Sequence, residues 1–412
     1  MIEFQKFTLD NGLRVIVHED KSTALACMNI LYDVGARDEH PDKTGFAHLF
    51  EHLMFGGSLN IPSYDEPLQK AGGENNAFTN NDITNYYLTL PAENIETGFW
   101  LESDRMLSLA FSDKSLEVQR NVVIEEYKQR YLNQPYGDVW LLLRPLVYKV
   151  HPYQWATIGK EISHIKNATM NDVRDFFFRF YRPNNAIMVV AGNINADYIM
   201  KLAEKWFGNI PAGTIIQRNL PQEPVQVEAR KISVNRDVPL DALYKVYHSC
   251  ARSDEEFYTV DLISDILSQG DSSRFYNELV KNKKLFSEIR ASVSGEFDKG
   301  MFIVSGKVNK GIKMEDAEAA IIVELDKLRT ETIKEEELTK VKNKVESTSV
   351  FSETEVLNKA MNLAFAEPLG DANNVSKEIE KYLSVTDTQI KEQAGIIFKE
   401  SNCSTLYYHS KN

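Results

Sequence analysis

Residues 45–53 read GFAHLFEHL, and residues 258–266 read YTVDLISDI, so apolar side chains recur at matching positions 213 residues apart. Gly57 and Gly270 keep the same offset. Solenoid repeats have periods of roughly 20–50 residues, so a repeat of this length indicates two copies of one domain rather than an array. The length of 412 residues also fits two domains.

The boundary between the two copies is expected near residue 220. The segment 211–224 contains three prolines and has no hydrophobic period, which is typical of a connection between domains. We therefore predict an N-terminal domain at residues 1–220 and a C-terminal homologous domain at residues 221–412.

Each copy mixes strand-like and helix-like stretches. Alternating or fully apolar runs predict strands, and 3.6-residue periods predict helices. Several loops between strands are too short for parallel crossovers, which favours mostly antiparallel or mixed sheets with helices packed on one face. The predicted class is α+β, with strands at 13–20, 83–91 and 186–194 and helices at 115–132 and 172–181.

Composition excludes several classes of function. The formal net charge is −13 and no dense Lys/Arg run is present, so nucleic acid is not an expected partner. No apolar run reaches the roughly 18–20 residues that cross a bilayer. The three cysteines show no C-x-x-C spacing, which argues against a disulfide framework or a cysteine zinc site. The first residues lack the pattern of a secretory signal, so we expect a cytoplasmic protein.

The segment HLFEH at residues 48–52 carries the chemistry. On a helix, His48 and His52 project from one face one turn apart and can share a metal ion. Glu51 lies on the same side, where it can accept a proton from water, in the inverted order of the H-E-x-x-H motif. Chance placement of polar residues on a half-buried helix is the alternative, and it is rare for this combination.

A catalytic zinc site needs a third protein ligand. In the predicted helix at 115–132, Glu126 falls on the same stripe as Leu116, Val123 and other inward positions, whereas Glu125 points aside. A buried carboxylate without a partner is costly, but binding to Zn²⁺ satisfies it. This favours Glu126 over Glu125 as the third ligand.

The first half of the chain contains the motifs GARDE at 35–39, HLFEH at 48–52, GGENNAFT at 72–79, TNYYL at 84–88, LESDRM at 101–106 and VVIEE at 122–126. Together these motifs resemble the pitrilysin, insulin-degrading enzyme and mitochondrial processing peptidase family, the inverzincins. The resemblance implies related α+β domains that form half of a clam-like chamber, with the zinc site in the first domain and Glu126 as a ligand. Gln119 stands where the family often has Glu, and it could still hydrogen-bond a ligand histidine.

The resemblance also implies a substrate strand. It assigns substrate contact to the edge strand that contains Asn76, Ala77, Phe78 and Thr79, to which an extended peptide adds by backbone hydrogen bonds. An ordinary strand is the alternative reading of the same residues.

In the second copy, His48, Glu51 and His52 are replaced by Asp261, Ser264 and Asp265, which cannot form the same zinc site. The C-terminal domain is therefore expected to lack a metal.

Relatives use an Arg and a Tyr, seven residues apart, to hold the substrate, and this chain has Val280 and Ser287 at those positions. The resemblance thus implies a heterodimer with a homologous subunit that supplies the Arg/Tyr pair. A homodimer, or a shifted alignment that lets Arg274 and Tyr276 act, is the alternative.

Together these patterns predict a zinc metalloendopeptidase with one Zn²⁺ per chain, which hydrolyses peptides or unfolded segments inside an enclosed chamber. His48, His52 and Glu126 are the expected ligands, and Glu51 is the general base. The alternative is a non-catalytic structural homologue, since respiratory-complex core subunits share this architecture but usually lose part of the metal motif.

Overall fold

The computed structural model describes residues 2–411. The chain forms two compact units that exchange segments. One boundary between the units falls at Pro221/Gln222, next to the predicted boundary near residue 220. The units are not contiguous in sequence, however, because Asn133–Gln154 belongs to the second unit and Phe351–Ser376 to the first. The first unit contains the residues up to Leu132, Trp155–Pro221 and Phe351–Ser376, and the second contains Asn133–Gln154, Gln222–Val350 and the residues from Lys377 onward.

The first unit is built on a six-stranded mixed sheet with the order β1-β2-β6-β3-β5-β4. Only β2 and β6 pair in parallel, and the other neighbours are antiparallel. The two edges of the sheet are β1 and β4. The strands are β1 (Gln5–Thr8), β2 (Arg14–Glu19), β3 (Leu25–Tyr32), β4 (Glu74–Thr79), β5 (Thr84–Pro91) and β6 (Ala186–Gly192).

The second unit repeats this topology with five strands in the order β7-β11-β8-β10-β9. These strands take the places of β2, β6, β3, β5 and β4, and the parallel pair recurs as β7 with β11. The α+β class with two mixed sheets is therefore confirmed. The strands are β7 (Arg230–Arg236), β8 (Ala242–His248), β9 (Phe286–Val293), β10 (Met301–Val308) and β11 (Cys403–Ser410).

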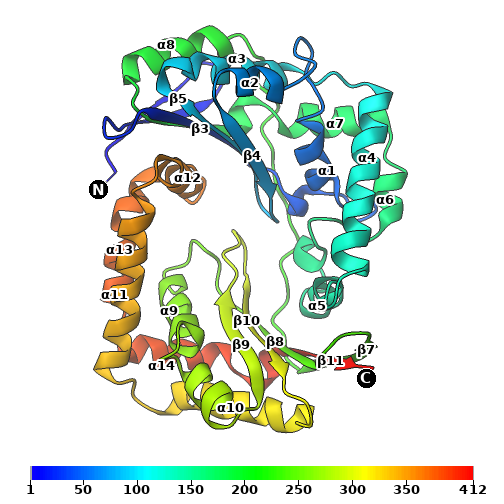
Figure 1. The fold of residues 1–412 in the computed structure, drawn as a ribbon, viewed down its shortest axis with the longest axis vertical. Helices are drawn as coiled ribbons and strands as arrows, with labels where there is room; N and C mark the ends of the chain where they lie inside the picture. The colour runs from blue at the N-terminus through cyan, green and yellow to red at the C-terminus, as the bar shows by residue number, and fades with distance from the viewer. Residues whose placement is uncertain (1, 412) are drawn as a thin grey trace. The chain divides into compact units, whose positions relative to one another are not determined.

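Helices cover both faces of each sheet, whereas the sequence predicted helices on one face only. In the first unit, α3 (Ile95–Leu107) packs on β5 and α8 (Ala196–Phe207) on β2, while α12 (Val356–Ala366) packs on β3 and β6. Figure 1 shows α3 and α8 on one side of this sheet and α12 on the other. Every residue of β6 is buried, which accounts for its fully apolar sequence AIMVVAG.

In the second unit, α9 (Phe257–Ser268) and α14 (Asp387–Ile397) share a core with Leu243 and Tyr407 on one face of the sheet. On the other face, α5 (Val139–Val147) packs through Leu143 against Val246 and Leu406. Each unit thus receives one covering helix, α12 or α5, from the other half of the sequence.

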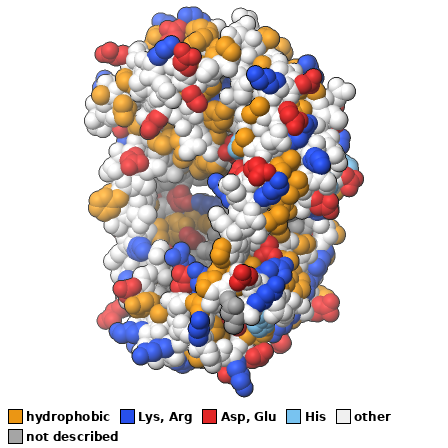
Figure 2. All heavy atoms as spheres, turned by 45° about the vertical axis from the view of Figure 1, so that its right-hand side comes forward, with side chains coloured by type: hydrophobic (Ala, Val, Ile, Leu, Met, Phe, Trp, Pro, Cys, Tyr) orange, Lys and Arg blue, Asp and Glu red, His pale blue; other side chains and the backbone are white. Residues whose placement is uncertain are grey.

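The remaining helices include two short π-helical stretches, Lys128–Leu132 and Tyr276–Asn282. The charged side chains on the face drawn in Figure 2 are of both signs and interspersed. No helix within residues 2–411 is long and apolar enough to cross a membrane. The other helices are α1 (Phe46–Leu53), α2 (Asp65–Lys70), α4 (Asp113–Tyr127), α6 (Ile162–Lys166), α7 (Met170–Phe180), α10 (Met314–Thr330), α11 (Glu335–Ser352) and α13 (Val375–Ser384).

Candidate metal centre and active site

The two histidines and Glu51 lie on the short helix α1. Its apolar side, which includes Leu49 and Phe50, is buried in the first unit. The Phe50 ring stacks on Phe176 and on Tyr181, with ring centroids 4.8 and 5.2 Å apart. This packing holds the helix by its apolar side and leaves the polar side facing α4.

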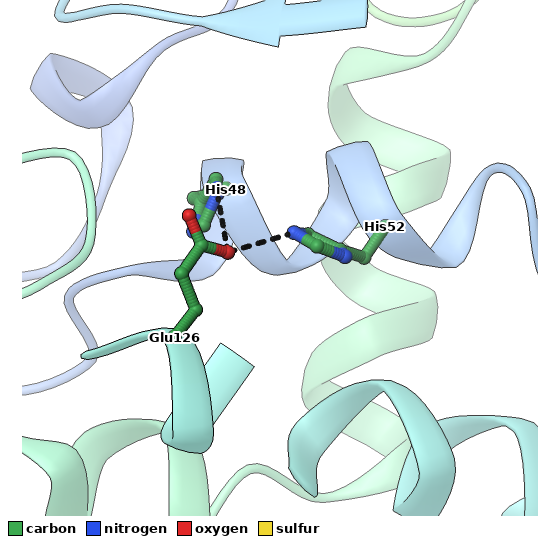
Figure 3. A group of neighbouring side chains, drawn as sticks. All are labelled: His48, His52 and Glu126. Carbon is green, nitrogen blue, oxygen red and sulfur yellow. Dashed lines mark ion pairs between the residues drawn. The ribbon is translucent and has the colours of Figure 1, made fainter. Parts of the chain in front are cut away.

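Helix α4 supplies the carboxylate that completes the group. Its N-terminus is capped by Ser112, whose hydroxyl accepts the N–H of Ser115. About four turns further along the helix, Glu126 Oε2 lies 3.6 Å from His48 Nε2 and 3.3 Å from His52 Nε2 (Figure 3). Within residues 2–411 this is the single group of three His, Cys, Asp or Glu residues close enough to hold a metal ion.

The second oxygen of Glu126 is also engaged. Arg130 Nη1 lies 2.9 Å from Glu126 Oε1, so one carboxylate oxygen is paired and the other faces the histidines. Arg130 stands in the π-helical stretch that follows α4, a type of irregularity that often occurs at functional sites. Glu125 pairs instead with Lys128 on the exposed side of the helix. The geometry therefore brings Glu126, and not Glu125, to the histidines.

The electrostatics of this group suit a cation. Burial lowers the pKa of His48 to about 4, so the imidazole is neutral and can donate a lone pair at neutral pH. The hydrogen bond from His52 lowers the pKa of Glu126, which keeps the carboxylate ionised. His48 Nδ1 is buried and has no hydrogen-bond partner. Two imidazoles with one carboxylate match the ligand set of catalytic zinc sites, so these residues fit the metal.

Glu51 lies beside the group without belonging to it. Its Oε2 accepts a hydrogen bond of 2.7 Å from the hydroxyl of Thr79 at the end of β4. Burial raises the pKa of Glu51, while the Thr79 hydroxyl acts in the opposite direction. A carboxylate with a raised pKa is suited to exchange a proton during a reaction.

The strand that carries Asn76, Ala77, Phe78 and Thr79 is β4, at the edge of the six-stranded sheet. It pairs with β5 on one side, and Asn76 is exposed while the other three side chains are half-buried. The Phe78 ring contacts Phe365 of α12 with centroids 6.0 Å apart. The backbone groups on the outer side of this strand are free of sheet pairing.

Gln119 lies seven residues before Glu126 on α4, and its side-chain nitrogen lies near Gly56. Among the hydrogen bonds of residues 2–411, none joins Gln119 to His48 or His52. Its predicted role in orienting a ligand histidine stays a prediction.

The equivalent helix of the second unit carries a different polar group. The Tyr382 hydroxyl donates to Asp261 Oδ2 at 2.7 Å, and the Ser264 hydroxyl donates to the backbone oxygen of Asp261. Burial and the neighbouring Asp261 raise the pKa of Asp265 to about 6.

Of the residues considered for substrate contact in the second unit, Arg274 forms two hydrogen bonds to Glu337. Val280 packs against the core of the unit. The Ser287 hydroxyl donates to the backbone oxygen of Lys307.

Two residues near the site were given no role from the sequence, although Glu39 belongs to the motif GARDE. Arg130 lies on the predicted stripe four residues after Glu126, and this spacing could have revealed their ion pair. Glu39 accepts hydrogen bonds from the backbone of α1, a contact that bridges a loop and leaves no periodic signal.

Comparison with known proteins identifies the family. The pattern of the insulinase family, peptidase family M16, matches residues 14–138, and that of the peptidase M16 inactive domain matches residues 167–345. The zinc protease PqqE of Helicobacter pylori is 29% identical over 98% of this chain and 92% of that protein. The beta subunit of the mitochondrial-processing peptidase of Saccharomyces cerevisiae is 27% identical over 54% of this chain and 48% of that protein.

A solved structure agrees with these matches. The crystal structure of a protease from Helicobacter pylori superposes with a TM-score of 0.93 at 28% sequence identity, covering 99% of this chain and 100% of that chain. The two family patterns and the whole-length likeness to proteins named as zinc proteases agree on one assignment. The chain belongs to the insulinase family of peptidases, M16.

Proposed function

We propose that the chain is a zinc-dependent endopeptidase that hydrolyses peptides or unfolded polypeptide segments. One observation carries the proposal: one possible ligand atom from each of His48, His52 and Glu126 lies within 4.8 Å of the other two, and Glu51 is on the same side of α1. A structural homologue has no need to keep this combination, because a polar group of this kind destabilises a half-buried surface unless it binds something.

The roles follow from the chemistry of each side chain. His48, His52 and Glu126 would hold Zn²⁺, which when bound acidifies a water molecule and polarises a peptide carbonyl. Glu51 accepts the proton of the attacking water and then donates it to the leaving amine. One carboxylate can serve both steps because it is regenerated in its ionised form when the amine departs.

Substrate binding is assigned to the free edge of β4. An extended peptide can pair with the outer backbone groups of Asn76, Ala77 and Phe78 as an added strand. Recognition through the backbone tolerates many sequences, which suits a peptidase that acts on unfolded segments. The hydrogen bond between Thr79 and Glu51 supports this assignment, since it joins the end of that strand to the general base.

We further propose that the chain works in an enclosed chamber with a homologous subunit that supplies an Arg/Tyr pair. Val280 and Ser287 offer neither a cation nor a phenol, and Arg274 is paired with Glu337. The likeness to a beta subunit of the mitochondrial-processing peptidase fits this division of tasks. A homodimer without the pair is the second possible assembly.

The test combines metal content with peptide cleavage. The purified chain, loaded with zinc, is incubated with a mixed peptide library, and products are identified by mass spectrometry. We expect one zinc per chain, and we expect Glu51→Gln to keep the zinc while the cleavage rate falls by about 10²–10⁴-fold. The matched control is Ser264→Ala, at the equivalent position of α9, which should change neither quantity.

The assembly is tested in the same assay by adding a homologous subunit that carries the Arg/Tyr pair. Cleavage that appears only with this subunit supports the divided assembly, and cleavage by the chain alone rules out a requirement for it. A zinc-loaded chain that is inactive under both conditions would refute the endopeptidase proposal and favour a binding role.

A further inference from the structure

Helix α1 begins at a residue that cannot cap it. The N-cap is Gly45, which has no side chain and adopts the left-handed conformation with φ of 88°. The first N–H groups of a helix have no partner within the helix and need an acceptor from elsewhere. Ser, Thr, Asp or Asn at the N-cap usually provides it. In α1 the acceptor must come from another part of the chain.

Glu39 supplies this acceptor from the preceding loop. Its Oε2 accepts the N–H of Gly45 at 2.9 Å, and its Oε1 accepts the N–H of Ala47 at 2.8 Å. When it is ionised, the carboxylate also places a negative charge at the positive end of the helix dipole. One carboxylate therefore binds two backbone N–H groups in the first turn of α1, the turn that also carries His48.

The surroundings fix Glu39 in turn. Its side chain is buried, and the indole N–H of Trp155 donates to Oε2 at 3.0 Å. The same indole N–H also lies 3.1 Å from the backbone oxygen of Ala36. All three hydrogen bonds of the Glu39 carboxylate are accepted ones, so they favour its ionised form, whereas burial acts in the opposite direction and raises the pKa of Glu39 to about 8.

The loop that carries Glu39 is also attached to the turn that follows the proposed substrate strand. The N–H of Ala36 donates to the backbone oxygen of Asn80, and the N–H of Arg37 donates to that of Asn81. Asn80 directly follows Thr79, which holds Glu51. The loop therefore connects the end of β4 to the start of α1.

We propose that Glu39 is a positioning residue for the metal ligands, which sets the height and rotation of α1 so that His48 and His52 meet Glu126. This inference rests on the proposed zinc site. His48 follows Ala47 directly, so a displacement of the first turn moves His48 more than His52, which lies one turn further along the helix.

The main test is the zinc affinity of Glu39→Gln, measured by competition with a chelator. A glutamine amide presents a donor where Glu39 presents an acceptor, so one of the three N–H groups meets another N–H. We expect zinc affinity to fall by about 10–100-fold, the range known for residues that orient metal ligands. The visible spectrum of the Co²⁺-substituted protein should change as well, because it reports ligand geometry.

The matched control is Glu367→Gln in the same unit. Glu367 is also buried, pairs with Lys6 at 2.5 Å and accepts the N–H of Ala372 at 3.1 Å, but it does not contact α1. Its replacement should lower thermal stability while zinc affinity and the Co²⁺ spectrum stay at wild-type values. This control separates a general loss of stability from a displaced ligand.

The outcomes distinguish the two proposals. If the wild-type chain binds no zinc, the proposed function fails. If the wild type binds zinc and Glu39→Gln binds it equally well with the same Co²⁺ spectrum, the positioning role is wrong. Should Glu39→Gln not fold, Glu39→Asp replaces it, since it keeps the charge but reaches only one of the two helix N–H groups. Unchanged zinc affinity in that variant would also overturn the inference.

Discussion

Helices α1 and α9 occupy equivalent places in two copies of one fold, yet their polar side chains have different partners. In α1, His48 Nδ1 is buried without a partner and burial raises the pKa of Glu51. In α9, Asp261 is stabilised by the hydroxyl of Tyr382. The polar residues of the first helix converge with Glu126 into a group that could hold a metal ion, whereas Asp261 of the second helix has a partner within its own unit. Functional sites often keep such unsatisfied groups at a cost in stability.

The largest expected effect comes from removing a ligand in α1. His52→Ala should abolish stoichiometric zinc binding and reduce peptide cleavage to background, because two ligands do not form a stable catalytic site. Metal analysis after gel filtration measures the loss. Asp265→Asn, at the equivalent position of α9, serves as the control and should retain full zinc. Loss of zinc in both variants would mean that the two helices do not differ in this way.

A smaller effect is expected from the contact between the edge strand and the general base. Thr79→Val keeps the shape of the side chain but removes the hydroxyl that donates to Glu51. One such hydrogen bond contributes about 1.4 kcal/mol, so kcat should fall about tenfold. Steady-state kinetics on a peptide substrate tests this, and Thr79→Ser should restore most of the rate. Equal losses in both variants would point to packing instead.

Stability should respond to the internal partner in α9. Tyr382→Phe removes the hydrogen bond to Asp261 and should lower the free energy of unfolding by about 1 kcal/mol, with zinc affinity unchanged. Denaturant titration gives this value. The exposed Tyr198 provides a control, because Tyr198→Phe should leave stability unaltered. An unchanged midpoint for Tyr382→Phe would show that Asp261 needs no such partner.

The smallest effect is a pH dependence in the same helix. Burial first, and then Asp261, raise the folded-state pKa of Asp265 to about 6 from the ordinary value of 3.8. The folded state thus favours the protonated carboxyl, and this contribution is present below pH 3.8 and is lost as the pH rises through 6.

Replacement by an amide tests this sign. At pH 8 the free energy of unfolding of Asp265→Asn should exceed that of the wild type by about 1 kcal/mol or less, since Asp265 is partly exposed. Near pH 4 the two values should be equal. Thermal unfolding of both proteins across this range measures the difference. A stabilisation that does not vary with pH would contradict the role of the charge.

Much of the site could be predicted because it depends on spacing within single helices. The positions of His48, Glu51 and His52 follow from the helical repeat, and Glu126 from its place on the inward stripe of α4. The expected strands at 13–20, 83–91 and 186–194 correspond to β2, β5 and β6.

Contacts between distant segments could not be predicted in the same way. Periodicity shows that α5 and α12 each have an apolar side, but not which sheet that side covers. The capping of α1 by Glu39 depends on the path of a loop, and the position of the Gln119 side chain near Gly56 depends on how α4 packs against the segment that follows α1. Pattern alone also gives no sign that the helix becomes π-helical at Lys128–Leu132.

The exchange of α12 has a consequence for how the protein is made. The strands β3 and β6 at the centre of the first sheet are complete once residue 192 has been synthesised, but the helix that covers one of their faces ends at Ala366. Domains of nascent chains usually fold in order from the N-terminus. Here the ribosome must add most of the second half before α12 can cover the first sheet, so we expect one apolar face of that sheet to stay uncovered during much of translation.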